Sequence, residues 1–351
     1  MRICNALGLA TLLATTPLAA QDISAERLAE TVQVLASDSF EGRAPGTRGE
    51  DRTIGYLIGR FQALGLEPGG PDGAWTQTVP LLHTQLGEAG KFAVNVGGKL
   101  VAWTPGTDIY VSTLQPLDVA IIAAAPVVFV GYGVTAPERK WDDFKGQNLK
   151  GKVAVFLVND PDFAATKADP VAGKFGGRTM TYYGRWTYKF EEAARRGAVA
   201  ALIVHETEAA GYGWNVVVSP RGENYDLVRN PGEVTSLALQ GWLSGEAAAK
   251  LFAAAGQDLA KLRVAARSAK FRPVALNAML DAAAPSKHEV VESHNVLAKI
   301  PGTTHADETV LYCILSSGNC KVSSRSKRST LSAAMPLSRT LSQINTAGFL
   351  R

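Results

Sequence analysis

The chain has few cysteines, and they are unevenly placed. Of its 351 residues only Cys4, Cys313 and Cys320 are cysteines, so none lies between residues 5 and 312. An exported domain that depended on disulfides would need paired cysteines within its folded part. Cys313 and Cys320 have six residues between them and no histidine nearby, which is a weak pattern for a metal site. The sequence therefore predicts a fold that does not rely on disulfides.

Acidic side chains and histidines are missing from the end of the chain. No Asp, Glu or His follows Glu308. Residues 313–351 hold nine serines and six cations, which are Lys321, Arg325, Lys327, Arg328, Arg339 and Arg351. The whole chain has a net charge of +4, so without these six cations the rest has a net charge of −2. The basic character belongs to this segment and does not indicate nucleic-acid binding by the folded part.

The sequence also lacks an apolar run of the roughly 20 residues that a membrane-spanning helix needs. A shorter apolar run, residues 6–14, follows Arg2, and small residues precede Gln21. This order is typical of a secretory signal peptide and its cleavage site. Cys4 precedes the apolar run, so it cannot be a lipid-attachment cysteine after that site. We therefore predict that residues 1–20 are a signal peptide and that the chain is exported, to the periplasm or outside the cell.

What the sequence does contain is the pattern of an α/β protein, with 46% hydrophobic and 19% charged residues. The spacing of apolar residues predicts amphipathic helices over 24–37 and 52–64. We expect Ser24 to cap the first and Gly65 to end the second. Further elements are expected as strands at 75–84, 126–134, 151–160, 198–206 and 274–280, helices at 188–196 and 244–255, a loop at 219–233, and two strands joined by a Pro-Gly turn within 293–315.

The order of the central elements predicts how they connect. The apolar runs 151–160 and 198–206 are typical of strands buried on both faces of a sheet. A short helix lies between them, and strand, helix, strand in this order predicts a right-handed parallel crossover.

One stretch, "HEVVESH" at residues 288–294, invites comparison with the zinc-binding H-E-x-x-H helix. That motif needs two histidines four residues apart on one helix face. His288 and His294 are six apart, which places them about 120° out of line on a helix, or roughly 20 Å apart on a strand. We therefore interpret His294 as a structural histidine at a strand. The other histidines, His83, His205 and His305, are isolated in the sequence.

A second stretch, "GRTMTYYGRWTYKF" at residues 177–190, is rich in Tyr, Trp and Arg. It has two interpretations, a peptide- or sugar-binding surface and a loop anchored by packed aromatics. The packed loop is favoured, because buried aromatic rings are commoner than exposed ones. No phosphate-binding loop and no G-x-S-x-G elbow occurs in the sequence.

Four segments taken together resemble the secreted zinc aminopeptidases related to glutamate carboxypeptidase II and the transferrin receptor. Residues 35–70 resemble the opening helix, loop and helix of that family. Residues 128–161 and 191–206 resemble its protease-associated insert, and residues 292–312 resemble the return to the peptidase domain. The resemblance covers about residues 24–312. It implies a partial mixed-sheet α/β peptidase domain interrupted by a protease-associated insert.

The resemblance also implies chemistry. Members of the family release N-terminal residues from peptides by means of two zinc ions that share a carboxylate, and the metals activate water. Their ligands are histidines and carboxylates that follow the strand matching residues 308–312. Since no Asp, Glu or His follows Glu308 here, no catalytic, cofactor-binding or metal-ligating residue can be assigned, and we expect this chain to bind no zinc. A slip of the reading frame just after Tyr312, in the gene or in its sequencing, is our hypothesis for the change in composition.

The predicted organisation is therefore a signal peptide (1–20), the first part of a peptidase domain (21–114), a protease-associated insert (115–265), the return to the peptidase domain (266–312) and a non-homologous tail (313–351), which we expect to be disordered. Two functions remain open. One is a zinc aminopeptidase by descent, inactive in this chain. The other is a non-catalytic module that binds peptides or proteins through the insert. Neither involves nucleic acid or a membrane span.

Overall fold

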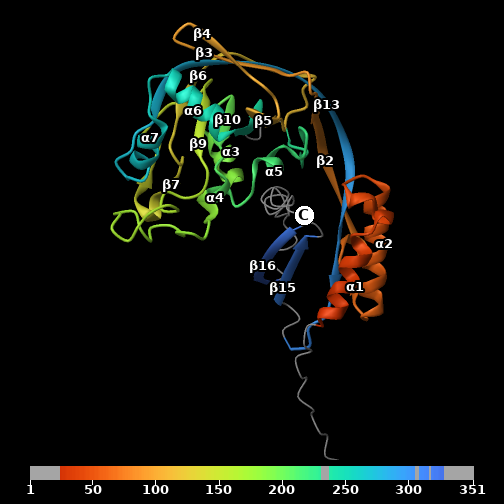
Figure 1. Cartoon of the computed structure of the whole chain (residues 1–351). Helices are drawn as coiled ribbons and strands as arrows, with labels where there is room; N and C mark the ends of the chain where they lie inside the picture. The colour runs from red at the N-terminus through yellow and green to blue at the C-terminus, as the bar shows by residue number, and fades with distance from the viewer. Residues whose placement is uncertain (1–23, 231–236, 305–307, 316–317, 328–351) are drawn as a thin grey trace, which may run out of the picture.

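The computed structural model describes residues 24–230, 237–304, 308–315 and 318–327 and shows a mixed α/β protein (Figure 1). Its main feature is a 10-stranded sheet that contains parallel and antiparallel pairs. The strands are β2 (Thr76–Leu86), β3 (Lys91–Val96), β4 (Lys99–Trp103), β5 (Ile109–Ser112), β6 (Val119–Phe129), β9 (Val153–Leu157), β10 (Ala200–Val204), β11 (Glu223–Leu227), β12 (Leu239–Leu243) and β13 (Val274–Val296). They follow the order β11-β2-β13-β6-β9-β10-β12-β5, and the β3–β4 hairpin pairs with β13.

The centre of the sheet confirms that the two predicted strands are parallel, and the right-handed sense of the crossover stays a prediction. β9 and β10 are parallel, with Ala200 opposite Val153, and helix α3 (Trp186–Arg195) connects them. Every residue of β9 and β10 is buried, as expected for strands covered on both faces. The alternation predicted for residues 274–280 is also confirmed, because Leu276, Ala278 and Leu280 are buried whereas the residues between them are exposed.

β13 joins two parts of the molecule. Its first half pairs with β3 and β6, and its second half, residues 286–296, pairs with β2. In Figure 1 this long strand runs from the main sheet to the pair of N-terminal helices. We call residues 87–285 the body, and residues 24–86 with 286–299 the arm. The short pair β1 (Glu67–Pro68) and β14 (Ala298–Lys299) closes the arm at its far end.

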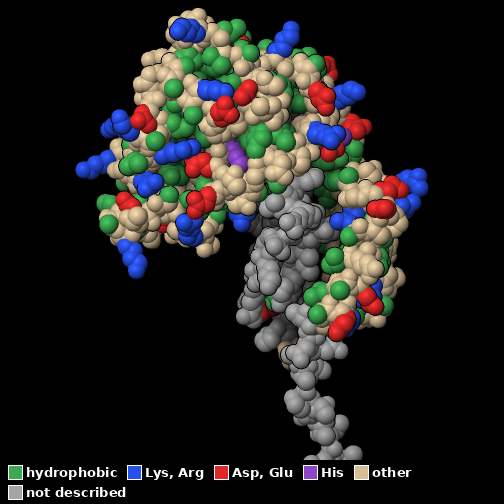
Figure 2. All heavy atoms as spheres, in the orientation of Figure 1, with side chains coloured by type: hydrophobic (Ala, Val, Ile, Leu, Met, Phe, Trp, Pro, Cys, Tyr) green, Lys and Arg blue, Asp and Glu red, His purple; other side chains and the backbone are tan. Residues whose placement is uncertain are grey.

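The two predicted N-terminal helices are present as α1 (Ala25–Leu35) and α2 (Arg48–Ala63). Ser24 caps α1 by accepting a hydrogen bond from the backbone N–H of Arg27. Gly65, with a φ of 72°, lies in the left-handed conformation that commonly follows a helix end. However, α1 contains no buried residue, and only Gly49 and Thr53 of α2 are buried. The apolar face of α1 is exposed at Leu28 and Val32, whereas the apolar residues of α2, which are Ile54, Leu57, Ile58 and Phe61, are half-buried (Figure 2).

The remaining elements lie mostly in the body. They are the strand pair β7 (Thr135–Ala136) and β8 (Trp141–Asp142) and the helices α4 (Thr207–Ala210), α5 (Trp214–Val218), α6 (Gly245–Ala254) and α7 (Leu259–Ala265). The predicted helix at 244–255 is thus confirmed as α6, and Ser244 caps it. The loop predicted at 219–233 is partly wrong, because residues 223–227 form β11 at the edge of β2. Its polar residues gave no sign of a strand.

The C-terminal region also departs from expectation. β15 (Glu308–Leu315) pairs antiparallel with β16 (Gly318–Lys327). The tail was expected to be disordered, but residues 318–327 form the serine-rich strand β16, whose backbone pairs with the apolar strand β15. Residues 328–351 and the predicted signal peptide lie outside the described residues.

Two buried clusters form the core on the faces of the body's sheet. The larger includes Trp103 and Ile109 before residue 115 and Leu276 and Leu280 after residue 265. The division of the chain at 114 and 265 stays a prediction. None of the helices in the described ranges has the length and apolar character needed to cross a bilayer.

Candidate functional site

The histidines do not gather at one place. "HEVVESH" lies in β13, so it is a strand and not a zinc-binding helix. His288 and His294 are six positions apart along this strand, which is roughly 20 Å. His205 is buried in the body with its Nε2 3.0 Å from the carbonyl oxygen of Tyr212. His305 lies outside the described residues.

The fifth histidine, His83, stands in a cluster of polar side chains on three neighbouring strands. Its Nε2 lies 3.0 Å from Glu223 Oε1 on β11, and its Nδ1 lies 3.1 Å from Glu289 Oε1 on β13. The ring stacks on Tyr225, with centroids 4.5 Å apart. Burial is the main cause that raises the pKa of Tyr225 to about 12, and the charge of Glu223 adds to it.

This cluster is suited to joining strands rather than to holding a metal. The two ring nitrogens of His83 face two different carboxylates, so the three groups do not converge on a common point. Ionised carboxylates only accept hydrogen bonds, so a ring nitrogen that carries a hydrogen donates it to the carboxylate it faces. Sequence reasoning missed the cluster because Glu223 lay in a predicted loop, and no spacing signal connects it to His83.

A buried lysine organises the loops at one end of the body. Lys189 of α3 is fully buried, and its Nζ donates to the carbonyl oxygens of Tyr132, Asn159 and Tyr183 at 2.7, 3.1 and 3.3 Å. Burial lowers the pKa of Lys189 to about 8, although the charges of Asp160 and Asp143 oppose this. Three carbonyl contacts in a closed interior indicate a structural clamp rather than a reacting amine.

Two buried aspartates complete this region. Asp143 accepts hydrogen bonds from Val134 N and Trp141 Nε1, and burial raises its pKa to about 7. Asp160 accepts from the N–H and hydroxyl of Thr181, and burial raises its pKa as well. Asp143 thus holds its own segment, residues 134–143, whereas Asp160 connects to Thr181 farther along the chain.

The aromatic-rich stretch 177–190 packs against this clamp. Tyr188 and Phe190 are buried, and Tyr183 makes edge contacts with Tyr188 and Phe175. Arg139 stacks over the rings of Phe175 and Tyr183, 5.0 and 5.6 Å from their centroids. The interpretation as a loop anchored by packed aromatics is confirmed.

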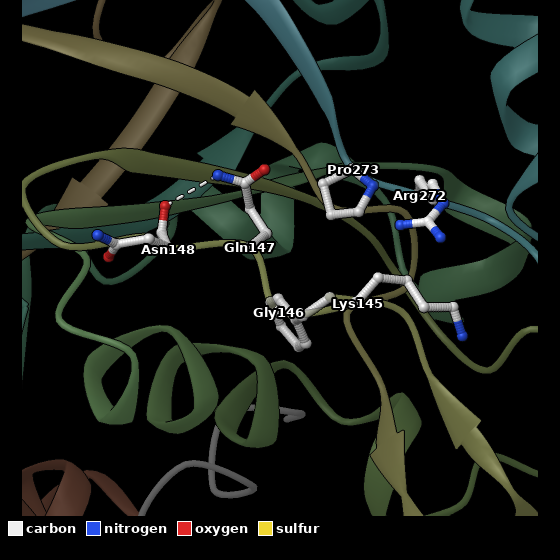
Figure 3. A pocket seen from close by; sticks show the side chains of 7 residues that line it. Lys145, Gly146, Gln147, Asn148, Arg272 and Pro273 are labelled. Carbon is white, nitrogen blue, oxygen red and sulfur yellow. Dashed lines mark hydrogen bonds between the residues drawn. The ribbon is translucent and has the colours of Figure 1, made fainter.

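A polar hollow of about 310 Å³ opens where the loop after β8 meets the start of β13 (Figure 3). Figure 3 shows the side chains of Lys145 and Arg272 on the same side of the hollow. Within the described residues neither side chain has a hydrogen bond or ion pair. Gln147 donates to the carbonyl oxygen of Asn148. The hollow therefore offers two free cations to an anionic group, but both are open to water, where a single ion pair contributes about 0–1 kcal/mol.

The described residues do not fit the zinc pair that the sequence resemblance implies. Among them no three histidine, cysteine or carboxylate side chains lie close enough together to hold an ion. Glu50, a carboxylate near β13, already accepts from Gly46 N, Ser293 Oγ and His294 N. We derive no catalytic step through zinc from this chain.

Comparison with known proteins gives little further support. No protein-family model and no curated protein matches the sequence. Among solved structures, the aminopeptidase from Aneurinibacillus sp. strain AM-1 is 16% identical with a TM-score of 0.30, and the zinc aminopeptidase BSAP from Bacillus subtilis is 15% identical with a TM-score of 0.29. The matches cover 80% and 78% of this chain but 49% and 48% of those, so the chain spans about half their length. TM-scores this low carry no weight for fold or function.

Proposed function

We propose that this chain is the first part of an exported zinc aminopeptidase by descent, carrying a protease-associated insert, and that it does not hydrolyse peptides as it stands. In this proposal residues 21–114 and 266–312 belong to the peptidase domain, residues 115–265 are the insert, and residues 1–20 direct export to the periplasm or beyond the cell.

The observation that carries the proposal is the pairing of β2 with β13. These strands are about 200 residues apart in the sequence, yet they are antiparallel neighbours from Thr76–Val296 to Leu86–Ser286. β1 and β14 pair in the same way farther along. When a chain forms one strand, then a folded body, and then a second strand that pairs with the first, the body has the topology expected of a domain inserted into another. The excursion spans residues 87–285, so this supports the order of the segments, whereas the bounds 115–265 of the insert rest on the resemblance alone.

The proposal is tested with the purified chain. We expect less than one zinc per chain by metal analysis, and no chelator-sensitive hydrolysis of aminoacyl-arylamides, because the ligand types needed for a zinc pair are absent after Glu308. Hydrolysis that a chelator abolishes and zinc restores would contradict the proposed inactivity.

A second candidate is a non-catalytic module that binds peptides or proteins. The observation that favours it is the loop region of the body, where Lys189, Asp143 and Asp160 hold the backbone by hydrogen bonds. Asp143 is followed by the hollow that Lys145 and Arg272 line, and among the described residues neither of these two side chains has an ion pair. Binding of an acidic peptide that is lost in Arg272→Ala, with no hydrolysis of any peptide, would select this candidate.

A further inference from the structure

Among the described residues, the outer edge of β13 in the arm has hydrogen-bond partners at two points and none between them. Over residues 286–296 this strand pairs with β2 on one side. The backbone N–H of Ser286 donates to Asp118 O at 2.7 Å, and that of His294 donates to Glu50 Oε1 at 3.2 Å. Neither acceptor belongs to β2. These two N–H groups therefore point away from β2, toward the opposite edge.

Alternation along the strand identifies the groups that lie between these two points. In an antiparallel ladder every second residue directs both its N–H and its C=O to the same side. His288, Val290 and Glu292 therefore face the same edge as Ser286 and His294. Within the described residues these three backbones have no hydrogen-bond partner on that edge. We call residues 288–292 the edge window.

The window is short because it is closed at both ends. Asp118 directly precedes β6, and Val119 of β6 pairs with Pro285. β6 therefore already pairs with β13 on the N-terminal side of residue 286. At the other end the Glu50 carboxylate occupies the position beside His294. A second copy of β13 would continue past the window and collide with Asp118 and Val119. A chain end of about five residues, which can turn away, fits instead.

Charge sets the direction of such a chain end. Two carboxylates, those of Glu292 and Glu50, lie at the C-terminal end of the window, whereas the one carboxylate at the other end, Asp118, lies 3.9 Å from the His288 ring. An antiparallel peptide places its N-terminal ammonium beside Glu292. The side chain of Val290, 62% exposed at the middle of the window, offers apolar contact to the peptide.

We propose that the edge window of β13 binds the unblocked N-terminus of an extended peptide by main-chain pairing, antiparallel to β13. The peptide adds a strand to an exposed sheet edge, which is an established mode of peptide recognition. This binding requires neither zinc nor hydrolysis, so it is separate from the function proposed above.

The test uses the full chain and the peptide Ala-Val-Thr-Val-Gly with a fluorescent label at its C-terminus, followed by fluorescence anisotropy. Val290→Pro removes only the N–H that points to the open edge and leaves the ladder to β2 intact, so proline is tolerated there. We expect Val290→Pro to weaken binding at least about tenfold, through the lost hydrogen bonds. Val290→Thr, which keeps the N–H, is the matched control and should bind like the parent chain.

Two further probes keep the test decisive if Val290→Pro disturbs the fold. A peptide with N-methyl groups on the amides that face the window should bind at least about tenfold less to the unaltered chain, and so should an N-acetylated peptide. Glu292→Gln should weaken only the unblocked peptide. No binding by the parent chain, or equal binding of the N-methylated peptide, would overturn the proposal.

Discussion

The body and the arm have the same kinds of apolar sequence pattern, but the apolar residues are buried in the body and exposed on α1 of the arm. In the body, β9 and β10 are entirely buried, and α3 contributes Tyr188, Lys189 and Phe190 to the interior. In the arm, α1 has no buried residue, and Leu28 and Val32 are 56% and 63% exposed. An amphipathic pattern thus predicts that a helix has an apolar face, but burial needs a partner for that face. We expect the stability of the molecule to come mainly from the body.

The largest expected effect comes from matched deletions in the two parts. Leu202→Ala removes a side chain that is buried in β10, so we expect it to lower the free energy of unfolding by about 3 kcal/mol. Val32→Ala on α1 removes a mostly exposed side chain and should change it by no more than about 0.5 kcal/mol. Urea unfolding followed by circular dichroism measures both. Similar losses for the two variants would mean that the arm is packed as tightly as the body.

The second prediction concerns the pH dependence of the body. Folded Asp143 keeps its proton up to about pH 7, whereas its ordinary pKa is 3.8. Unfolding therefore releases this proton at intermediate pH, and the free energy of unfolding should fall as pH rises from about 4 to about 7. Urea unfolding across this range should show a flatter profile for Asp143→Asn.

A matched control uses an aspartate whose pKa is shifted in the opposite direction. Asp169 lies near the surface, and hydrogen bonds from Thr166 lower its pKa, so its small contribution to the free energy of unfolding is lost as pH falls. Asp169→Asn should therefore leave the fall between pH 4 and pH 7 in place. If Asp143→Asn and the parent chain have the same slope, Asp143 is not the group that titrates in the body.

The smallest effect is expected at the junction between the parts. His83 connects β11 of the body with β2 and β13, and its side chain is largely buried between them. We expect His83→Ala to lower the free energy of unfolding by about 1 kcal/mol, through lost hydrogen bonds and ring stacking. Glu289→Gln, at a carboxylate that is 67% exposed, should change it by less than about 0.5 kcal/mol. Thermal unfolding measures the loss in both variants. A larger loss in Glu289→Gln than in His83→Ala would mean that Glu289, and not His83, stabilises the contact between the body and the arm.

Sequence reasoning succeeded where the signal is local. Ser24 and Gly65 mark helix ends because capping depends on residues within one turn. The buried strands were predictable because both faces must be apolar. β11 was missed, because Asn224 and Asp226 belong to a strand only through its pairing with β2. The His83 cluster was out of reach for the same reason, since its members come from residues 140 and 206 positions away.

By itself the sequence determined the local elements of the body, the apolar faces of α1 and α2, and the lack of acids and histidines after Glu308. These depend on short-range periodicity and on composition. Only the tertiary structure decided that β2 and β13 pair across 200 residues, that Lys189 is enclosed by three carbonyls, and that the apolar face of α1 stays exposed. Pairing and burial depend on which distant segments meet, and a pattern within one segment does not specify its partner.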